Sequence, residues 1–245
     1  HANGQPNLER MERLVRELAD LHNRDIEVVL VSSGAIGTGA SRMGMKKIPK
    51  TLPEKQALAA IGQGRLLHMY EKFFADYGKT VAQVLLTRED LDERIRYLNA
   101  TNTLLAILNM QVIPIINEND TVVVEEIKIG DNDTLSTMVA GIVNADLLII
   151  LSDVDGLYDS DPRSNKNARL QSEVYEVTEE MEANAVARGT TFASGGMLTK
   201  LKSARNCMAA GIPMVIANSA QKNVIRRIVA GEELGTVFVP REEKM

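Results

Sequence analysis

Apolar residues recur at helical spacing at the start of the chain and then in short continuous runs. Between residues 7 and 21, leucine, valine and methionine fall on one helical face, and Asn7 stands where an N-cap is expected. Val28–Val31 is a continuous aliphatic run that leads into Ser32-Ser33-Gly34. That pattern is typical of a buried parallel strand followed by a turn.

The same alternation of helix and strand continues along the chain. Further helices are predicted near residues 54–76, 97–109, 134–144, 196–210 and 224–230, and further strands at 81–86, 112–116, 147–151, 214–217 and 236–239. This order predicts an α/β fold with a mostly parallel sheet and helices on its faces. Residues 153–175 are polar and turn-rich, which indicates a surface excursion or hairpin rather than a linker. We therefore expect one domain over residues 1–245.

The composition narrows the class of function. The 245 residues are 44% hydrophobic and 25% charged, as in ordinary globular proteins, and a net charge of -5 argues against a dedicated nucleic-acid binder. One cysteine excludes an intrachain disulfide and, with three histidines, a Cys/His zinc site. No apolar run reaches the ~18 residues of a membrane span, and the first residues lack the apolar core of a secretory signal. These features predict a cytoplasmic protein that acts on small molecules without contacting a membrane.

Candidate chemistry follows the predicted strands, where ligands bind in parallel α/β sheets. Residues 32–39 form a small-residue turn from a strand into a helix start, where backbone N–H groups could bind an anion, although glycines in such turns serve packing equally often. Residues 117–120 (Asn-Glu-Asn-Asp) and 130–133 (Gly-Asp-Asn-Asp) gather carboxylates and amides, which suit a substrate that carries both an ammonium and a carboxylate. A plain polar turn, and an N-cap at Asp133, are the structural alternatives.

A second group of residues suits a polyphosphate. Ser194-Gly195-Gly196-Met197-Leu198-Thr199-Lys200 places two glycines and a lysine at a helix start, where free N–H groups and the helix dipole favour anions. Glycines before a helix and a surface lysine are also common without any function. Because both internal histidines, His22 and His68, fall in helical segments, a Ser-His-Asp triad has no convincing base. Phosphoryl transfer, which needs positioning and cations, fits the set better.

Five ordered segments together resemble the glutamate 5-kinase branch of the amino acid kinase family. They are Ser32–Ile36, Asn117–Asp120, Gly130–Asp133, Gly156–Tyr158 with Asp161–Arg163, and Gly195–Lys200. The resemblance runs from about residue 8 to about residue 239. It implies a three-layer αβα sandwich with a mainly parallel central sheet. The implied reaction is Mg²⁺-dependent transfer of the ATP γ-phosphoryl group to the side-chain carboxylate of L-glutamate, the first step of proline biosynthesis.

The resemblance also implies roles for individual residues. Ser33, Asp120 and Asn132 are expected to bind glutamate. Asp133 is expected to organise the catalytic lysines, and Lys200 to neutralise the transferring phosphoryl group. Ser152, Asp153 and residues 194–200 are expected to form the nucleotide site, and no residue is assigned as a metal ligand. A homo-oligomer, dimer or tetramer, and feedback inhibition by proline are implied as well.

Two differences from the family pattern keep alternatives open. Relatives begin with a strand that carries a Lys-x-Gly-Ser-type segment, and many bacterial relatives continue into a small RNA-binding-like domain. Neither segment has a counterpart in this sequence. We therefore expect a short form whose first strand lies outside this sequence. The alternatives are a family member that phosphorylates aspartate, acetylglutamate, carbamate or a nucleoside monophosphate, and an inactive sensor of nucleotide or amino acid.

Overall fold

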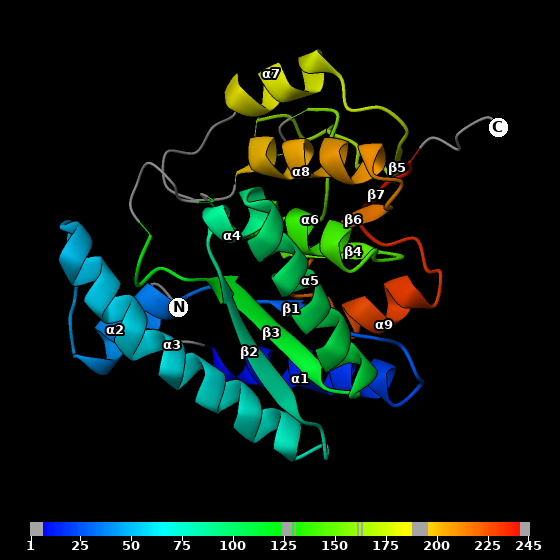
Figure 1. The fold of residues 1–245 in the computed structure, drawn as a ribbon. Helices are drawn as coiled ribbons and strands as arrows, with labels where there is room; N and C mark the ends of the chain where they lie inside the picture. The colour runs from blue at the N-terminus through cyan, green and yellow to red at the C-terminus, as the bar shows by residue number, and fades with distance from the viewer. Residues whose placement is uncertain are drawn as a thin grey trace. The chain divides into compact units, whose positions relative to one another are not determined.

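A computed structural model describes residues 7–123, 129, 131–160, 162, 164–187 and 196–240 (Figure 1). The chain divides into two compact units, residues 1–129 and 130–245, and each unit is described by itself. Within the described residues, no helix is both long and apolar enough to cross a membrane.

The first unit combines five helices with a three-stranded sheet in its described part. The helices are α1 (Leu8–His22), α2 (Ala35–Arg42), α3 (Leu52–Ala75), α4 (Arg88–Asp92) and α5 (Arg94–Asn109). The strands are β1 (Leu30–Val31), β2 (Val81–Leu86) and β3 (Ile113–Glu118), in the order β1-β3-β2 and parallel throughout. Every residue of β3 is buried, as expected for the central strand of a sheet covered by helices. Because β1 and β3 are neighbours and parallel, their carboxyl ends lie side by side.

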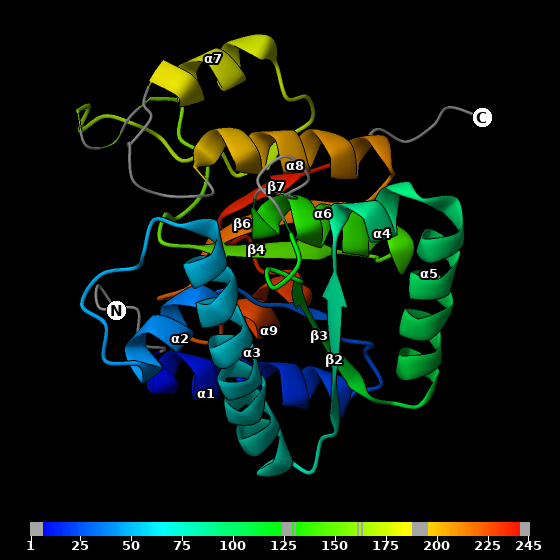
Figure 2. The ribbon, with the colours of Figure 1, turned by 60° about the vertical axis from the view of Figure 1, so that its left-hand side comes forward.

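Helices α2 and α3 pack closely through glycines, and they lie against each other in both ribbon views (Figures 1 and 2). A Cβ atom on Gly39 would lie 2.0 Å from the carbonyl oxygen of Leu58, and one on Gly62 would lie 1.7 Å from that of Ala35. No side chain larger than hydrogen fits at these distances. The glycines of the 32–39 segment thus include one that serves helix packing. The sequence indicated a helix start in this segment but not the extent of α2.

The short helix α4 escaped prediction, and its first turn explains why it forms. Thr87 ends the strand region as an N-cap, and its side chain and that of Asp90 form a reciprocal capping box. Burial raises the pKa of the Asp90 carboxyl, but hydrogen bonds from the Thr87 hydroxyl and backbone N–H, together with Arg96, outweigh it and hold the pKa below its usual 3.8.

The second unit, as far as it is described, consists of four helices and a four-stranded sheet. The helices are α6 (Asn132–Ile142), α7 (Glu179–Ala187), α8 (Met197–Ala209) and α9 (Val224–Val229). The strands are β4 (Leu148–Ser152), β5 (Glu173–Val174), β6 (Met214–Asn218) and β7 (Thr236–Phe238). Their order is β4-β6-β7-β5, with β4–β6 and β5–β7 parallel and β6–β7 antiparallel. Within the 153–175 segment, an antiparallel bridge joins Tyr158 and Leu170, which agrees with the hairpin, one of the two predicted alternatives. The segment also contributes β5, which pairs in parallel with β7.

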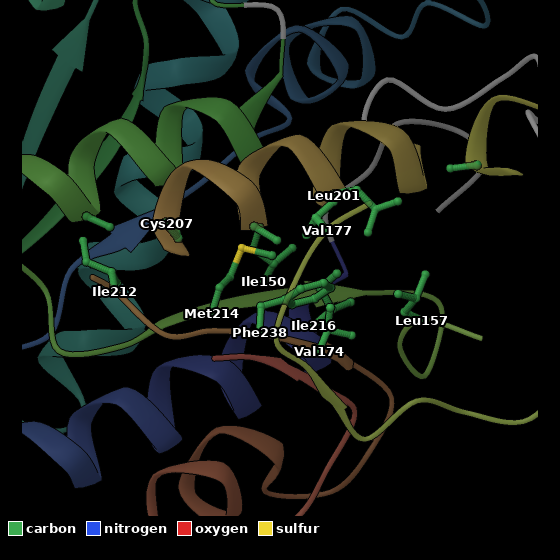
Figure 3. Packing of buried hydrophobic residues seen from close by; sticks show 13 residues of the cluster. Ile150, Leu157, Val174, Val177, Leu201, Cys207, Ile212, Met214, Ile216 and Phe238 are labelled. Carbon is green, nitrogen blue, oxygen red and sulfur yellow. The ribbon is translucent and has the colours of Figure 1, made fainter. Parts of the chain in front are cut away.

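Helices α6 and α8 pack side by side against this sheet (Figure 2). Figure 3 shows the apolar layer between α8 and the strands, where Leu201, Met214, Ile216 and Phe238 are completely or almost completely buried. This layer fixes the position of α8, and hence of the residues in its first turn.

Most predicted elements are confirmed, and two boundaries are wrong in a way that bears on the site. Strand β3 continues through Asn117 and Glu118, which were predicted to follow it. Helix α6 begins at Asn132 with Asp131 as its N-cap, so Asp133 lies in the first turn and is not the cap. Asp131 accepts a hydrogen bond from the Thr134 N–H at 2.9 Å, which leaves the Asp133 side chain available for another partner.

Candidate functional site

In the first unit, two of the predicted glutamate-binding residues stand at the ends of adjacent strands. Ser33 follows β1 and is exposed, and Asp120 follows β3 and is half-buried. The two strand ends are joined by a backbone hydrogen bond from Ser32 N–H to the Ile116 carbonyl, 2.8 Å long. The sheet thus brings the Ser33 turn and the Asp120 turn to the same edge, as the parallel pattern predicted.

The polar side chains at the end of β3 are buried and hydrogen-bonded. The Glu118 carboxylate accepts a hydrogen bond from the Ile129 N–H at 2.6 Å, and the Asn117 side-chain oxygen accepts one from the Glu118 N–H at 2.9 Å. Because both residues are less than 10% exposed, they hold the strand end in place rather than project into solvent. Of the 117–120 cluster, Asn119 and Asp120 are the partly exposed members, and Asp120 is the one that carries a carboxylate.

In the second unit, Asp133 and Lys200 form an ion pair between α6 and α8. The Lys200 Nζ atom lies 2.8 Å from the Asp133 Oδ2 atom, and the two side chains are 9% and 16% exposed. Burial raises the pKa of the Asp133 carboxyl, with a smaller contribution from the charge of Asp131, while the hydrogen bond and charge of Lys200 act in the opposite direction. The interpretation of Lys200 as an ordinary surface lysine is therefore wrong.

Lys200 stands in the first turn of α8, near the positive end of the helix dipole. Gly196 is the N-cap and has no side chain to occupy the free N–H groups, although its carbonyl accepts a hydrogen bond from the Thr199 hydroxyl at 2.7 Å. Met197, Leu198 and Thr199 are partly exposed at this helix end. Ser194 and Gly195 lie outside the described residues. A buried ammonium group beside free helix N–H groups is suited to negative charge.

The segment after β4 carries the remaining predicted nucleotide residues. Ser152 ends the strand, and its hydroxyl lies 3.3 Å from a carboxylate oxygen of Asp153. Strand β6 ends beside β4, where Ser152 and Asn218 are paired in the register. The Asn218 side chain donates a 2.9 Å hydrogen bond to Asp155, which fixes the turn that follows.

The structure therefore brings some predicted residues together within each unit. Ser33 and Asp120 share a sheet edge in the first unit, and Asp133 contacts Lys200 in the second. Asn132 is the first residue of α6, directly before Asp133. Sequence reasoning passed over three polar residues of α3, namely Gln56, Gln63 and Tyr70. The signal that could have revealed them is their spacing of seven residues within a predicted helix.

Comparison with known proteins places this arrangement in a family. The family model described as "Amino acid kinase family" matches residues 3–218, a range that contains all the candidate residues above. The chain belongs to the amino acid kinase family. The predicted fold class is confirmed by this match and by two solved structures that share the fold of the family.

Curated relatives within the amino acid kinase family are highly similar in sequence. Glutamate 5-kinase of Moorella thermoacetica is 56% identical over 244 residues, which cover 100% of this chain and 65% of that protein. Glutamate 5-kinase of Clostridium acetobutylicum is 54% identical over 243 residues, covering 99% of this chain and 91% of that protein. The chain thus spans slightly less than two thirds of the longer relative and nearly all of the shorter one. The resemblance to this branch is confirmed.

Solved structures of the same fold are more distant in sequence. Isopentenyl phosphate kinase of T. acidophilum has a TM-score of 0.62 at 17% identity, with 96% of this chain and 92% of that one covered. UMP kinase of Bacillus anthracis has a TM-score of 0.61 at 20% identity, with 97% and 89% covered. At these identities the likeness concerns the fold.

Proposed function

We propose that the protein transfers the γ-phosphoryl group of ATP to the side-chain carboxylate of L-glutamate, which gives glutamyl 5-phosphate and ADP as the first step of proline biosynthesis. The observation that carries the proposal is the buried Lys200–Asp133 ion pair at the start of α8. Two curated glutamate 5-kinases with 54% and 56% identity support the choice of acceptor.

The proposed reaction needs little proton chemistry from the protein. A carboxylate oxygen of glutamate forms a bond to the γ-phosphorus while the bond from that phosphorus to the β,γ-bridging oxygen breaks, and ADP leaves. The attacking carboxylate is already ionised at neutral pH, since the usual pKa of a glutamate side chain is about 4.3. A general base is therefore unnecessary, and the main demands are alignment and stabilisation of negative charge.

Within this proposal, Lys200 donates hydrogen bonds to the oxygens of the transferring phosphoryl group. Asp133 orients its ammonium group, which a flexible four-carbon side chain would otherwise leave mobile. Gly196, Met197 and Leu198 at the start of α8 offer N–H groups to the nucleotide. Ser152 ends β4 and Asp153 follows it, at a strand end where a nucleotide is expected. Ser194 and Gly195 are proposed as part of the same nucleotide site from the sequence.

Ser33, Asp120 and Asn132 are proposed to bind glutamate. Asp120 can accept hydrogen bonds from the substrate ammonium group, whereas Ser33 and Asn132 can donate to carboxylate oxygens. Asp120 is half-buried and Ser33 exposed at one sheet edge, which suits contact with a small polar ligand.

Mg²⁺ is proposed to accompany ATP. Among the described residues, no three side chains of the Asp, Glu, His or Cys type gather into a metal cage. Single carboxylates such as Asp153 are compatible with a Mg²⁺ ion that contacts mainly nucleotide phosphates and water. The ion would supply positive charge to the phosphate oxygens.

Further parts of the proposal rest on the family. We place residues 1–245 in one amino acid kinase domain, supported by a family match to residues 3–218 that includes parts of both compact units. A cytoplasmic location, a homo-oligomeric state and inhibition by proline are proposed from the resemblance to glutamate 5-kinases. Size measurement in solution and turnover with added proline test the last two.

The deciding experiment measures ADP release with Mg·ATP and each of five acceptors: L-glutamate, aspartate, acetylglutamate, carbamate and UMP. We expect turnover with glutamate and little with the others. Turnover with aspartate but not with glutamate would refute the acceptor assignment. Binding of glutamate and ATP by calorimetry without ADP release would refute catalysis and indicate a sensor.

A further inference from the structure

Three polar side chains stand at seven-residue intervals along α3. They are Gln56, Gln63 and Tyr70. Seven residues amount to nearly two helical turns, so the three side chains lie along one face of the helix with a drift of only about 20° per interval. We call these three residues the α3 polar row.

Each member of the α3 polar row contacts a different point in or after the ends of β1 and β3. The side-chain oxygen of Gln63 accepts a hydrogen bond from the Asn117 side-chain amide at 2.9 Å. The Tyr70 hydroxyl and the Ser32 hydroxyl are 3.0 Å apart and share a hydrogen bond. The Gln56 amide donates to the backbone carbonyl of Val123 at 3.2 Å.

These contacts lie next to two of the residues proposed to bind glutamate, Ser33 and Asp120. Ser32 directly precedes Ser33. Asn117 and Val123 lie on either side of Asp120, three residues away in each direction. Helix α3 therefore contacts the residue before the Ser33 turn and residues on both sides of the Asp120 turn.

Two contacts of the α3 polar row are buried in a way that makes them sensitive to substitution. Tyr70, Ser32, Gln63 and Asn117 are all at most 9% exposed. If one partner of such a pair is lost, the polar group of the other is left buried without a hydrogen bond. The local structure then shifts to give that group a new partner. An alternative role in general folding would affect stability without any preference for one substrate.

Helix α3 also packs closely on α2, which begins directly after the Ser33 turn. Gly62, next to Gln63, packs so closely on α2 that a Cβ atom there would lie 1.7 Å from the Ala35 carbonyl oxygen and 2.5 Å from the Gly39 nitrogen. Helix α3 therefore contacts both ends of the segment 32–35, Ser32 through Tyr70 and Ala35 through Gly62.

We propose that Gln56, Gln63 and Tyr70 are positioning residues, which hold the Ser33 turn and the Asp120 turn in the arrangement that binds the amino-acid substrate. The assignment rests on the proposed function of these two turns. It predicts that weakening the α3 polar row raises KM for glutamate while KM for ATP stays the same.

The test compares two Tyr→Phe variants of the protein. Tyr70→Phe removes the hydroxyl that contacts Ser32 and keeps the ring. Tyr77→Phe is the matched control, because it removes a 2.8 Å hydrogen bond to Glu12 in the same unit, away from both turns. One lost hydrogen bond corresponds to about fivefold in binding, so we expect KM for glutamate to rise about fivefold in Tyr70→Phe and to stay unchanged in Tyr77→Phe.

A double variant shows whether Tyr70 acts through Ser32. Ser32→Ala with Tyr70→Phe should raise KM for glutamate no more than the stronger single variant, since both remove the same contact. Multiplied effects of the two substitutions would overturn the assignment. So would an unchanged KM for glutamate in Tyr70→Phe, or an equal rise in KM for glutamate and ATP.

The proposed function is checked separately by wild-type turnover. If the wild-type protein phosphorylates another acceptor, the ratio of variant to wild-type KM is measured for that acceptor. A raised ratio would then support the positioning role although the glutamate assignment had failed. An unchanged ratio would overturn the positioning role by itself.

Discussion

Substitution of Asp133 by alanine should destabilise the protein far more than loss of an exposed ion pair. The variant removes the carboxylate 2.8 Å from the Lys200 ammonium group, whose side chain is 9% exposed. Removing one partner of a buried ion pair costs about 3 to 5 kcal/mol, and the 16% exposure of the Asp133 side chain favours the lower end, about 3 kcal/mol. With a urea m-value of about 3 kcal/mol per molar for a chain of this size, the unfolding midpoint should fall by about 1 M.

The assay is urea unfolding followed by far-UV circular dichroism. Asp133→Asn keeps an acceptor of the same shape, so its midpoint should fall by roughly half as much. The control is Asp92→Ala, because Asp92 pairs with Arg88 at 3.3 Å and both side chains are about half exposed or more. Such surface pairs contribute at most about 1 kcal/mol. If the Asp133→Ala midpoint matched that of Asp92→Ala, our account of a buried, stabilising pair would be refuted.

Four further outcomes are expected. Gly62→Ala should lower the free energy of unfolding by several kcal/mol or prevent folding, because its Cβ would clash with backbone atoms. Gly64→Ala on the same helix meets nothing within 4 Å and should raise the free energy of unfolding by up to about 1 kcal/mol, so equal urea midpoints for the two variants would contradict the packing argument. The folded-state pKa of Asp90 lies below 3.8, so its contribution to stability is present above about pH 4 and is lost as the pH falls through that lowered pKa. Urea midpoints measured between about pH 5 and pH 3 should therefore fall less steeply in Asp90→Asn than in wild type. Lys200→Ala should lower kcat by about 10²- to 10³-fold with a much smaller change in KM for glutamate, and an unchanged kcat would disprove its role. Asp120→Ala should weaken glutamate use while ATP binding by calorimetry stays intact; equal loss of both would indicate a folding defect.

The sequence pattern predicts elements well where apolar periodicity is strong. The strand at residues 81–86 and the N-cap at Asn7 are confirmed, because each depends on local propensity and spacing. For α2 the sequence indicated only a helix start, because its glycines weaken helical propensity. The helix forms against α3 through contacts that only the folded chain shows.

Polar residues inside buried elements are also hard to predict, because their hydrogen-bond partners come from distant parts of the chain. Asn117 and Glu118 were assigned to a turn because strand interiors rarely carry such side chains. Gln63 and the Ile129 N–H supply their hydrogen-bond partners from distant parts of the first unit, and no local pattern indicates this pairing. The residue types at Asp133 and Lys200 indicated a functional site in the sequence. Their contact could not be predicted, because the two residues are 67 positions apart and meet only through the packing of α6 on α8.

The lone cysteine offers a way to observe motion in the second unit. Cys207 lies on α8 beneath its apolar face and is 1% exposed, and burial raises the pKa of its thiol. A thiol reagent can therefore react only when α8 separates from the sheet or the unit unfolds. Because the chain has one cysteine, the rate of labelling reports how often the element that carries Lys200 opens, and a slower rate with bound nucleotide would measure how strongly the ligand closes it.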